Sequence, residues 1–408
     1  MNGRRRTAGW IALGTLALSL CACEASESDR YDADASRPPS TAPVPTPVPS
    51  PSATAAPVAG GSIAAAALGT DTGLLIGLRA DETDDPLTSP GAYRTIWISN
   101  DGEGLRERPF ERVILTPKSE DAAELWAFGP VRQRTATDTI EYVVGRALPD
   151  APRAIAIRDD PNESIVMSER LTYVGDDMVS LQAGASYWAG NGYAYSQSAW
   201  VKTFEQVGRG GPRYDRFATR WDDDAHLRMQ EALGDELSEP YTDEAAGEAM
   251  EEEQGLGLAR PLGDNWIVER EGRLWTPKVV GLFDYPASMY ATVALPAQLL
   301  SKIQPIEETP NWTAIAITRA NVRDTFLSDK RNYVLLRTDD KLLLYAYVDD
   351  APSGEPIWTM SLKPRETVVM VKWFDGAAKP EWAERFANAY VSDDYGSPGE
   401  SGQPLTPD

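Results

Sequence analysis

The sequence has very few of the side chains that most hydrolytic and redox sites need. Its 408 residues include two cysteines, Cys21 and Cys23, and a single histidine, His226. Catalytic triads use a histidine to carry the proton, and zinc sites usually take two or more His or Cys ligands. We therefore expect no triad or thiol chemistry, no metal site and no cofactor, and we assign no catalytic residue.

Phosphate-binding loops and an excess of positive charge are missing as well. No glycine-rich loop of the Walker type and no GxGxxG motif after a strand occurs, and Gly208–Gly211 is too short for either. The 62 Asp and Glu residues outnumber the 39 Lys and Arg residues, which gives a formal net charge of −23. Such a surface repels phosphate backbones, so we expect no nucleic-acid partner, whereas a cationic protein is a candidate partner.

The N-terminus has the pattern of an export signal. Arg4, Arg5 and Arg6 precede an uncharged stretch over 7–20, which is shorter than the about 20 apolar residues of a membrane-spanning helix. The stretch ends in Leu-Cys-Ala-Cys, which resembles the lipobox of bacterial lipoproteins. The resemblance implies a signal peptide over 1–22 and a membrane lipid on Cys23. Cys21 is the alternative acylated residue, and an ordinary secretory signal is the alternative to lipidation.

Residues 23–69 form a linker in this interpretation. The tract over 37–57 is rich in Pro, Ser, Thr and Ala, and it favours a disordered, extended polyproline path because it has little apolar surface to bury. Twenty such residues at about 3.1 Å each reach roughly 60 Å. We expect a tether that holds the rest of the chain at the extracytoplasmic face of the cell membrane.

Loss of the signal peptide removes three Arg and no acidic residue, which leaves 36 basic and 62 acidic residues and a formal charge of −26. Acylation of Cys23 leaves no free thiol and no disulfide. Stability outside the cell must then come from a large core, for which the 42% hydrophobic content is adequate.

The remainder of the chain alternates short apolar runs with polar turns, as strands do. We predict an α+β fold that is predominantly antiparallel β with a few peripheral helices, in two packed subdomains. The main β-rich domain is expected over 70–305 with a helical excursion at 222–254, the second β-rich subdomain over 306–391, and a disordered tail over 392–408. Strands are expected at 73–78, 93–99, 112–116, 124–128, 139–146, 154–158, 164–168, 171–174, 178–181, 199–204, 265–269, 274–283, 290–295, 312–318, 333–337, 341–348 and 367–374.

Helices are expected at five places. The first begins with Asp222 as N-cap and has an apolar stripe of Leu227, Met229 and Leu233. A closing amphipathic helix is expected at 380–390. The other three are expected at 242–253, 296–303 and 320–327.

Two stretches carry a resemblance to a known module. Residues 168–195 read SERLTYVGDDMVSLQAGASYWAGNGYAY, and residues 282–300 read LFDYPASMYATVALPAQLL. Over about 165–300 the chain resembles the extracellular domain of unknown function shared by RsiV-type anti-sigma factors and PdaC-type deacetylases. The resemblance implies an outer sensing or wall-binding module. It transfers neither the deacetylase chemistry, whose His ligands a chain with one histidine lacks, nor any functional residue.

A cluster of aromatic residues is the candidate ligand-binding site. Tyr187, Trp188, Tyr193 and Tyr195 stand among the glycines of 184–192. Glycines allow tight turns that leave aromatic faces open, and such faces stack on sugar rings or cations. The alternative is a hairpin whose aromatic side chains pack on the core.

Carboxylates offer two further possibilities. Trp221-Asp-Asp-Asp224 has oxygen ligands for calcium but lacks the spacing of an EF-hand loop, so we interpret it as a solvated helix start. A pair of carboxylates suffices for glycoside hydrolysis. We therefore expect a non-catalytic binding or sensing lipoprotein at the cell envelope, with cell-wall glycan or a cationic protein as partner. The alternative is a carboxylate-based cell-envelope glycan hydrolase.

Overall fold

The structure is a computed structural model that describes fourteen ranges of the chain, all within one unit, Gly61–Asp408. Several expectations therefore lie outside the described residues: the lipid site at Cys23, the linker before residue 67, the strand at 154–158, the helices at 242–253 and 296–303, and the tail. The described ranges are 67–83, 91–118, 124–134, 139–148, 165–188, 193–207, 213–215, 220–222, 226–233, 259–283, 289–295, 309–319, 321–376 and 378–389.

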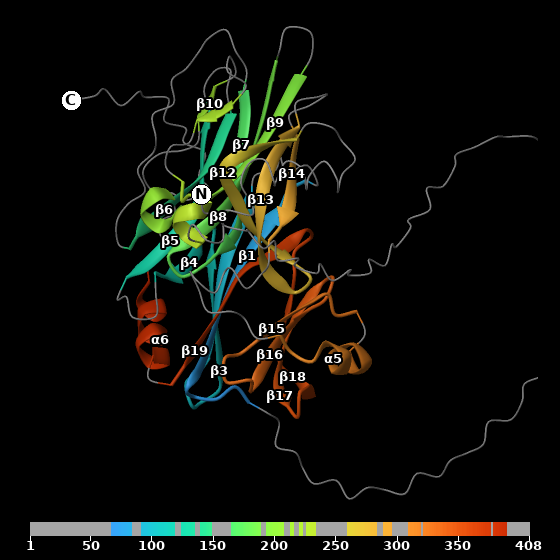
Figure 1. The fold of residues 1–408 in the computed structure, drawn as a ribbon. Helices are drawn as coiled ribbons and strands as arrows, with labels where there is room; N and C mark the ends of the chain where they lie inside the picture. Colours follow the sequence, from blue (N-terminus) through green and yellow to red (C-terminus); the bar gives the residue numbers. More distant parts are fainter. Residues whose placement is uncertain are drawn as a thin grey trace, which may run out of the picture. The chain divides into compact units, whose positions relative to one another are not determined.

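Antiparallel strands dominate the described residues, with a few short helices at the periphery, which confirms the predicted fold class (Figure 1). No helix in the described part of the chain combines the length and the apolarity that a membrane crossing requires. A central sheet has the order β19-β1-β2-β3. Its strands are β1 (Thr72–Asp81), β2 (Gly91–Asn100), β3 (Leu105–Glu111) and β19 (Glu366–Asp375).

The second large sheet has six strands in sequence order, antiparallel except for the parallel pair β6–β7. The apolar runs predicted at 164–168 and 171–174 are one continuous strand, β7. A short helix α1 (Phe204–Val207) follows the last strand. The strands are β4 (Ile114–Pro117), β5 (Leu125–Arg134), β6 (Thr139–Ala147), β7 (Ile165–Val174), β8 (Met178–Trp188) and β9 (Tyr193–Thr203).

Three further sheets, of two, three and four strands, contain strands that follow in the chain. The two-stranded sheet pairs β10 (Arg213–Asp215) with β11 (Arg220–Asp222). The three-stranded sheet contains β12 (Ala259–Glu271), β13 (Leu274–Phe283) and β14 (Met289–Ala294). The last sheet contains β15 (Asp324–Leu327), β16 (Tyr333–Arg337), β17 (Lys341–Val348) and β18 (Ala351–Ser361).

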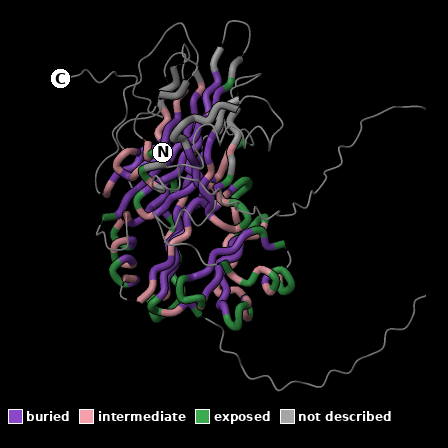
Figure 2. The backbone as a smooth tube through the Cα atoms, in the orientation of Figure 1, coloured by how far each residue is buried: buried purple, intermediate pink, exposed green. Residues whose placement is uncertain are grey.

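Strand β1 of the central sheet is buried over most of its length (Figure 2), and a different hydrophobic cluster lies on each of its faces. Along β1, Leu74, Ile76 and Leu78 belong to one hydrophobic cluster and Leu75 to another, because successive side chains of a strand point to opposite faces. The first cluster also holds residues of β12, β16 and β17 and a few of β7, β8 and β9, and the second holds residues of β4 to β9. This double burial explains why β1 is a nearly continuous apolar run.

The C-terminal part of the chain is built into the same fold. Strand β19 pairs with β1, so residues on either side of the predicted boundary at 305 share one sheet. Helix α6 (Ala378–Asn388) confirms the predicted closing helix, and it buries Trp382 and Phe386. The Phe386 ring lies 4.7 Å from the Trp97 ring of β2.

Three predictions of local structure are wrong. The expected strand at 312–318 is helix α5 (Trp312–Thr318), because the Asn311 side chain accepts a hydrogen bond from the Ala314 amide and caps a helix. The expected helix at 320–327 contains β15, whose four residues are buried against β16. Asp222 ends β11 rather than capping a helix, and the described helix of this region, α2 (Met229–Leu233), begins seven residues later.

Besides β15, four of the described strands lie where the sequence pattern predicts no strand: the short β10 and β11, and the longer β3 and β18. Strand β3 reads LRERPFE and is mostly exposed, so it lacks the apolar alternation of a half-buried strand. Strand β18 reads APSGEPIWTMS, and its two prolines and its glycine are turn signals in a sequence. Pairing with β2 and β17 fixes these two segments as strands.

Candidate functional site

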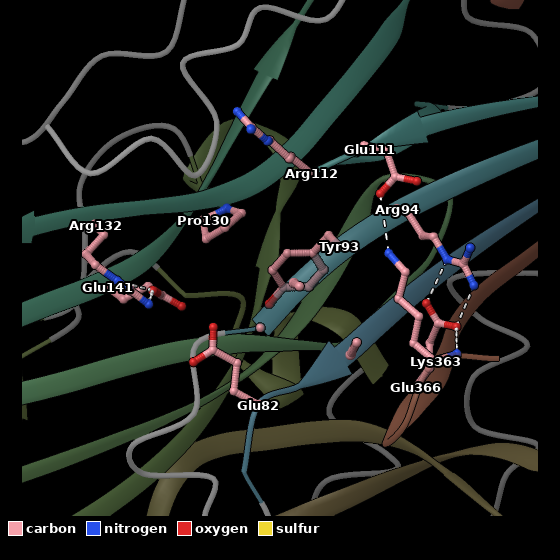
Figure 3. A pocket seen from close by; sticks show the side chains of 13 residues that line it. Glu82, Tyr93, Arg94, Glu111, Arg112, Pro130, Arg132, Glu141, Lys363 and Glu366 are labelled. Atoms are coloured by element: carbon pink, nitrogen blue, oxygen red, sulfur yellow. Dashed lines mark hydrogen bonds and ion pairs between the residues drawn. The ribbon is translucent and has the colours of Figure 1, made fainter.

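A pocket of about 250 Å³ lies where the central sheet meets the six-stranded sheet (Figure 3). The antiparallel register brings the end of β1, the start of β2 and the start of β19 to the same edge, since Ala80 pairs with both Ala92 and Glu366. Strands β5 and β6 supply the opposite wall. The lining consists of Ala80, Glu82, Gly91, Ala92, Tyr93, Arg94, Glu111, Arg112, Pro130, Arg132, Glu141, Lys363 and Glu366.

The lining balances four acidic and four basic side chains, although the chain as a whole is strongly acidic. Figure 3 shows two groups of these side chains, with Tyr93 and Pro130 between them and Arg112 apart from both groups. One group surrounds Arg94 and Glu366, and the other surrounds Arg132 and Glu141. The two groups differ in how completely their carboxylates are bound.

The carboxylate of Glu366 is fully engaged. Arg94 Nε lies 2.7 Å from Glu366 Oε1, and Arg94 Nη2 lies 2.6 Å from Oε2. The Lys363 amide also donates to Oε2 at 2.8 Å. Next to this pair, Lys363 Nζ lies 3.5 Å from Glu111 Oε2, and both of these side chains are more than half exposed. The acids on this side of the pocket therefore have cationic partners.

The carboxylate of Glu141 is only half engaged. Glu141 and Arg132 face each other across β6 and β5, and Arg132 Nε and Nη2 lie 2.9 Å and 2.8 Å from Glu141 Oε2. Its other oxygen, Oε1, is buried and has no hydrogen-bond partner among the described residues. The Glu141 side chain is only 6% exposed. A buried acceptor in this state is unusual and costs free energy unless a donor reaches it.

Electrostatics at Glu141 follow from this burial. Burial raises the pKa of the Glu141 carboxyl above its ordinary value, and the nearby charge of Glu82 adds to the rise. Arg132 and the nearby Gly91 amide act in the opposite direction because they favour the charged form, although the Gly91 amide does not have the geometry of a hydrogen bond to Oε1. Glu82 itself is exposed at the pocket.

Burial and a backbone hydrogen bond hold Tyr93 in place at the pocket. Tyr93 is 3% exposed, and its hydroxyl accepts a hydrogen bond from the Leu171 amide at 3.0 Å. Burial raises the pKa of Tyr93 well above its ordinary value, so the hydroxyl stays protonated. A Cβ at position 91 would lie 2.8 Å from the Tyr93 hydroxyl oxygen, so only glycine fits there. Arg112 turns the chain with a φ of 70°, and its amide donates to the Tyr93 carbonyl.

A second buried carboxylate belongs to the core of the same sheet. Glu169 of β7 accepts hydrogen bonds from Trp200 Nε1 on Oε1 and from the Val143 amide on Oε2, each at 2.9 Å. Lys202 Nζ lies 3.8 Å from Oε1, and the side chains of Glu169 and Lys202 are each 1% exposed. Neither residue lines the pocket. This arrangement stabilises the sheet interior and leaves no oxygen of Glu169 without a donor.

The structure describes the backbone of the predicted aromatic cluster. Tyr187 and Trp188 end β8, Tyr193 and Tyr195 begin β9, and the register places Trp188 opposite Tyr193. Only the Tyr195 side chain is described, and it is 40% exposed. The other three side chains lie outside the described residues, and Tyr195 is not among the residues that line the pocket.

Sequence reasoning did not select the pocket residues. Glu141 lies within the strand predicted at 139–146, and its signal is a glutamate flanked by Ile140 and Tyr142 in an otherwise apolar run. Its partners are distant in the sequence, so that signal alone does not identify a site. Among the described residues, no group of three or more His, Cys, Asp or Glu is arranged to hold a metal ion.

Comparison with known proteins does not place the chain in a family. No protein-family model matches the chain. No curated protein matches it either. Its function must therefore be inferred from the site itself.

Proposed function

We propose that this protein is a lipid-anchored, extracytoplasmic module that binds or senses a component of the cell envelope without transforming it. The observation that carries the proposal is the pocket around Glu141. Its polar wall is fixed by salt bridges, and one buried carboxylate oxygen is left for a ligand. A small pocket with a few convergent polar groups is typical of a binding site.

The carboxylates of the pocket are already held by arginines, which favours ligand binding over catalysis. A glycosidase places two carboxyl groups on either side of the scissile bond, and one of them acts as a nucleophile or activates water. In this pocket, Arg94 holds both oxygens of Glu366, and Arg132 holds one oxygen of Glu141. Side chains fixed in this way present a constant surface to a ligand.

The binding proposal is tested directly by asking whether the protein retains a cell-wall fragment and leaves it chemically unchanged. The full-length protein in detergent is dialysed to equilibrium against an enzymatic digest of purified cell wall, and the retained fragments are identified by mass spectrometry. We expect retention of fragments whose masses are unchanged. If no fragment is retained, or if retained fragments are converted to products, the proposal is wrong.

A carboxylate-based glycan hydrolase is the second candidate, and one observation favours it. A carboxyl group whose pKa is raised by burial, as that of Glu141 is, has the property of a general acid. Release of reducing ends from cell-wall glycan measures this activity. Release that is abolished by Glu141→Gln but kept by Asp339→Asn, a variant outside the pocket, would establish the hydrolase and refute the binding proposal.

The anchor is tested by labelling in a bacterial host. Cells that express the full-length protein are fed an alkyne fatty acid, and the protein is then probed for the label. We expect Cys23→Ser to lose the label and Cys21→Ser to keep it. The opposite pattern moves the lipid to Cys21, and no labelling of the unaltered protein refutes lipid anchoring.

The aromatic cluster is part of the same proposal as a surface for cell-wall glycan. Pull-down of the full-length protein on purified wall glycan and on cationic proteins measures this contact. We expect Trp188→Ala and Tyr193→Ala to weaken the pull-down on glycan, because stacking on sugar rings uses these faces. Unchanged pull-down in both variants removes the aromatic residues from the site.

A further inference from the structure

The two ends of the pocket differ in the ligand group that they can accept. At the Glu366 end, the carboxylate already has donors on both oxygens. At the Glu141 end, Oε1 is buried in the lining and has no donor among the described residues. A group that enters at this end must therefore donate a hydrogen bond.

The charge at the Glu141 end selects among donors. Glu141, Glu82 and Arg132 lie at this end and Arg112 lies apart from them (Figure 3), so this end has one more acidic than basic side chain although the lining as a whole is balanced. A hydroxyl group would satisfy Oε1 but leave the extra negative charge unbalanced. A protonated primary amine brings one positive charge and three donors, and its hydrogen bonds to a carboxylate are charge-assisted.

The net negative charge of the whole chain also favours a cationic ligand. The chain has a formal net charge of −23, which raises the local concentration of cations and disfavours anions near its surface. A divalent metal ion is a poorer occupant than an amine, because hard cations take six or more oxygen ligands. The described residues contain no group of three acids or histidines arranged for one.

The middle of the pocket suits an aliphatic chain behind the amine. Figure 3 shows Pro130 and Tyr93 between the two charged groups, and Ala80 and Ala92 add two small apolar side chains to the lining. A volume of about 250 Å³ holds a group of the size of an amino-acid side chain. The pocket thus combines a polar end with an apolar middle.

We propose that the pocket binds an alkylammonium group, with Glu141 Oε1 accepting its hydrogen bond, Glu82 adding negative charge, and the apolar middle contacting its methylene groups. This inference rests on the proposed binding function and specifies its ligand class as a primary amine on a short aliphatic chain. The chemistry is that of a lysine-like side chain in an envelope peptide or protein.

Two matched probes test the inference by isothermal titration calorimetry of the full-length protein in detergent. The first is Nα-acetyl-lysinamide, and the second is the same compound with a hydroxyl group in place of the side-chain ammonium. We expect the ammonium probe to bind about tenfold or more tightly than the hydroxyl probe, as a charge-assisted hydrogen bond predicts. Equal affinities, or no binding of the ammonium probe, would overturn the inference.

Three variants locate the binding group. Glu141→Gln keeps the shape of the side chain and is expected to weaken the ammonium probe about tenfold, and Glu82→Gln to weaken it about threefold through charge alone. Asp339→Asn removes one charge outside the pocket, so it is expected to leave the affinity unchanged. If Glu141→Gln does not fold, the affinities of Glu82→Gln and Asp339→Asn for the ammonium probe are compared instead. Equal affinities in these two variants would contradict the inference.

The failure of this inference and that of the proposed function are distinguishable. Retention of unmodified wall fragments together with no binding of the ammonium probe refutes the ligand class and leaves the binding function standing. Turnover of wall fragments refutes the binding function itself.

Discussion

Two glutamates of the six-stranded sheet occupy comparable positions and have different partners. Glu141 on β6 and Glu169 on β7 are both buried, and these neighbouring strands pair in parallel. Glu169 lies in the sheet interior, where its two oxygens accept hydrogen bonds from Trp200 and Val143. Glu141 lies at the pocket, where Arg132 binds one oxygen and the other has no donor among the described residues.

The difference separates a structural carboxylate from a functional one. A buried charge with a complete set of partners stabilises the native arrangement, and removal of one partner is costly. A buried carboxylate with an incomplete set weakens the fold slightly until a ligand completes it. Burial alone therefore does not identify a binding residue in this protein, and the count of donors on each oxygen does.

The largest expected effect is that of Glu169→Gln. This change leaves the charge of Lys202 without its carboxylate partner and disturbs the acceptor for Trp200 Nε1. We expect the free energy of unfolding to fall by about 3 kcal/mol. Urea denaturation followed by tryptophan fluorescence measures it, and the double variant Glu169→Gln, Lys202→Met should recover part of the loss. A single variant as stable as the unaltered protein would contradict the structural role of Glu169.

A smaller loss is expected at a buried ion pair between two other sheets. Arg270 of β12 binds Asp324 of β15 through Nε at 2.9 Å, and its guanidinium lies 4.2 Å from the centre of the Phe326 ring. Asp324→Asn removes the charge and keeps the size, so we expect a loss of about 2 kcal/mol in the free energy of unfolding. The same urea experiment tests it. A loss as large as that of Glu169→Gln would mean that the deeper burial of Glu169, 1% exposed against 8% for Asp324, does not rank these two sites.

Glu141→Gln is expected to change stability by less than about 1 kcal/mol, because burial already disfavours the charged form of Glu141. The pH dependence is the sharper measurement. The raised pKa means that the folded state binds more protons than the unfolded state between pH 4.5 and that pKa, so stability falls as pH rises through this window. Glu82, Arg132 and the Gly91 amide face this carboxyl. The decrease in stability with rising pH should be smaller in Glu141→Gln. An unchanged decrease would mean that another titratable group causes it.

The smallest effect is expected at an exposed ion pair. Arg323 Nε lies 2.7 Å from Asp339 Oδ1, and both side chains are more than 60% exposed. Solvent and salt screen such a pair, so Asp339→Asn should leave the urea midpoint unchanged within error. A clear shift of the midpoint would show that removal of one charge by itself changes the stability of this acidic protein. The stability changes of Glu141→Gln and Glu169→Gln would then have to be corrected for this general effect.

The fold follows from the sequence where local pattern and tertiary environment agree. The apolar run of β1 predicts a buried strand because both of its faces are covered. In α5, Ile315 is buried and Ile317 is 79% exposed, so the apolar alternation that predicted a strand does not describe the environment. The helix depends instead on the cap at Asn311. The charged strand β3 forms only because β2 offers a pairing edge.

The pocket depends on contacts that a single sequence does not reveal. The pairing of Arg132 with Glu141 needs the exact register of β5 and β6, and the approach of Glu82 needs the packing of two sheets. The alternation of β6 does show that a glutamate stands among apolar residues. It does not show whether both oxygens of that glutamate have hydrogen-bond donors, as those of Glu169 do, or whether one oxygen has none.

The state of the Glu141 carboxyl in the presence of a ligand tests the central claim most directly. Carbon-13 NMR of side-chain carboxyl groups, with the Glu141 signal assigned by its absence in Glu141→Gln, gives the pKa of that group with and without Nα-acetyl-lysinamide. We predict that the ammonium probe lowers the pKa of Glu141 because it favours the charged form, and that the Glu169 signal does not shift. An unchanged pKa of Glu141 at saturating probe, or an equal response at Glu169, would contradict the account.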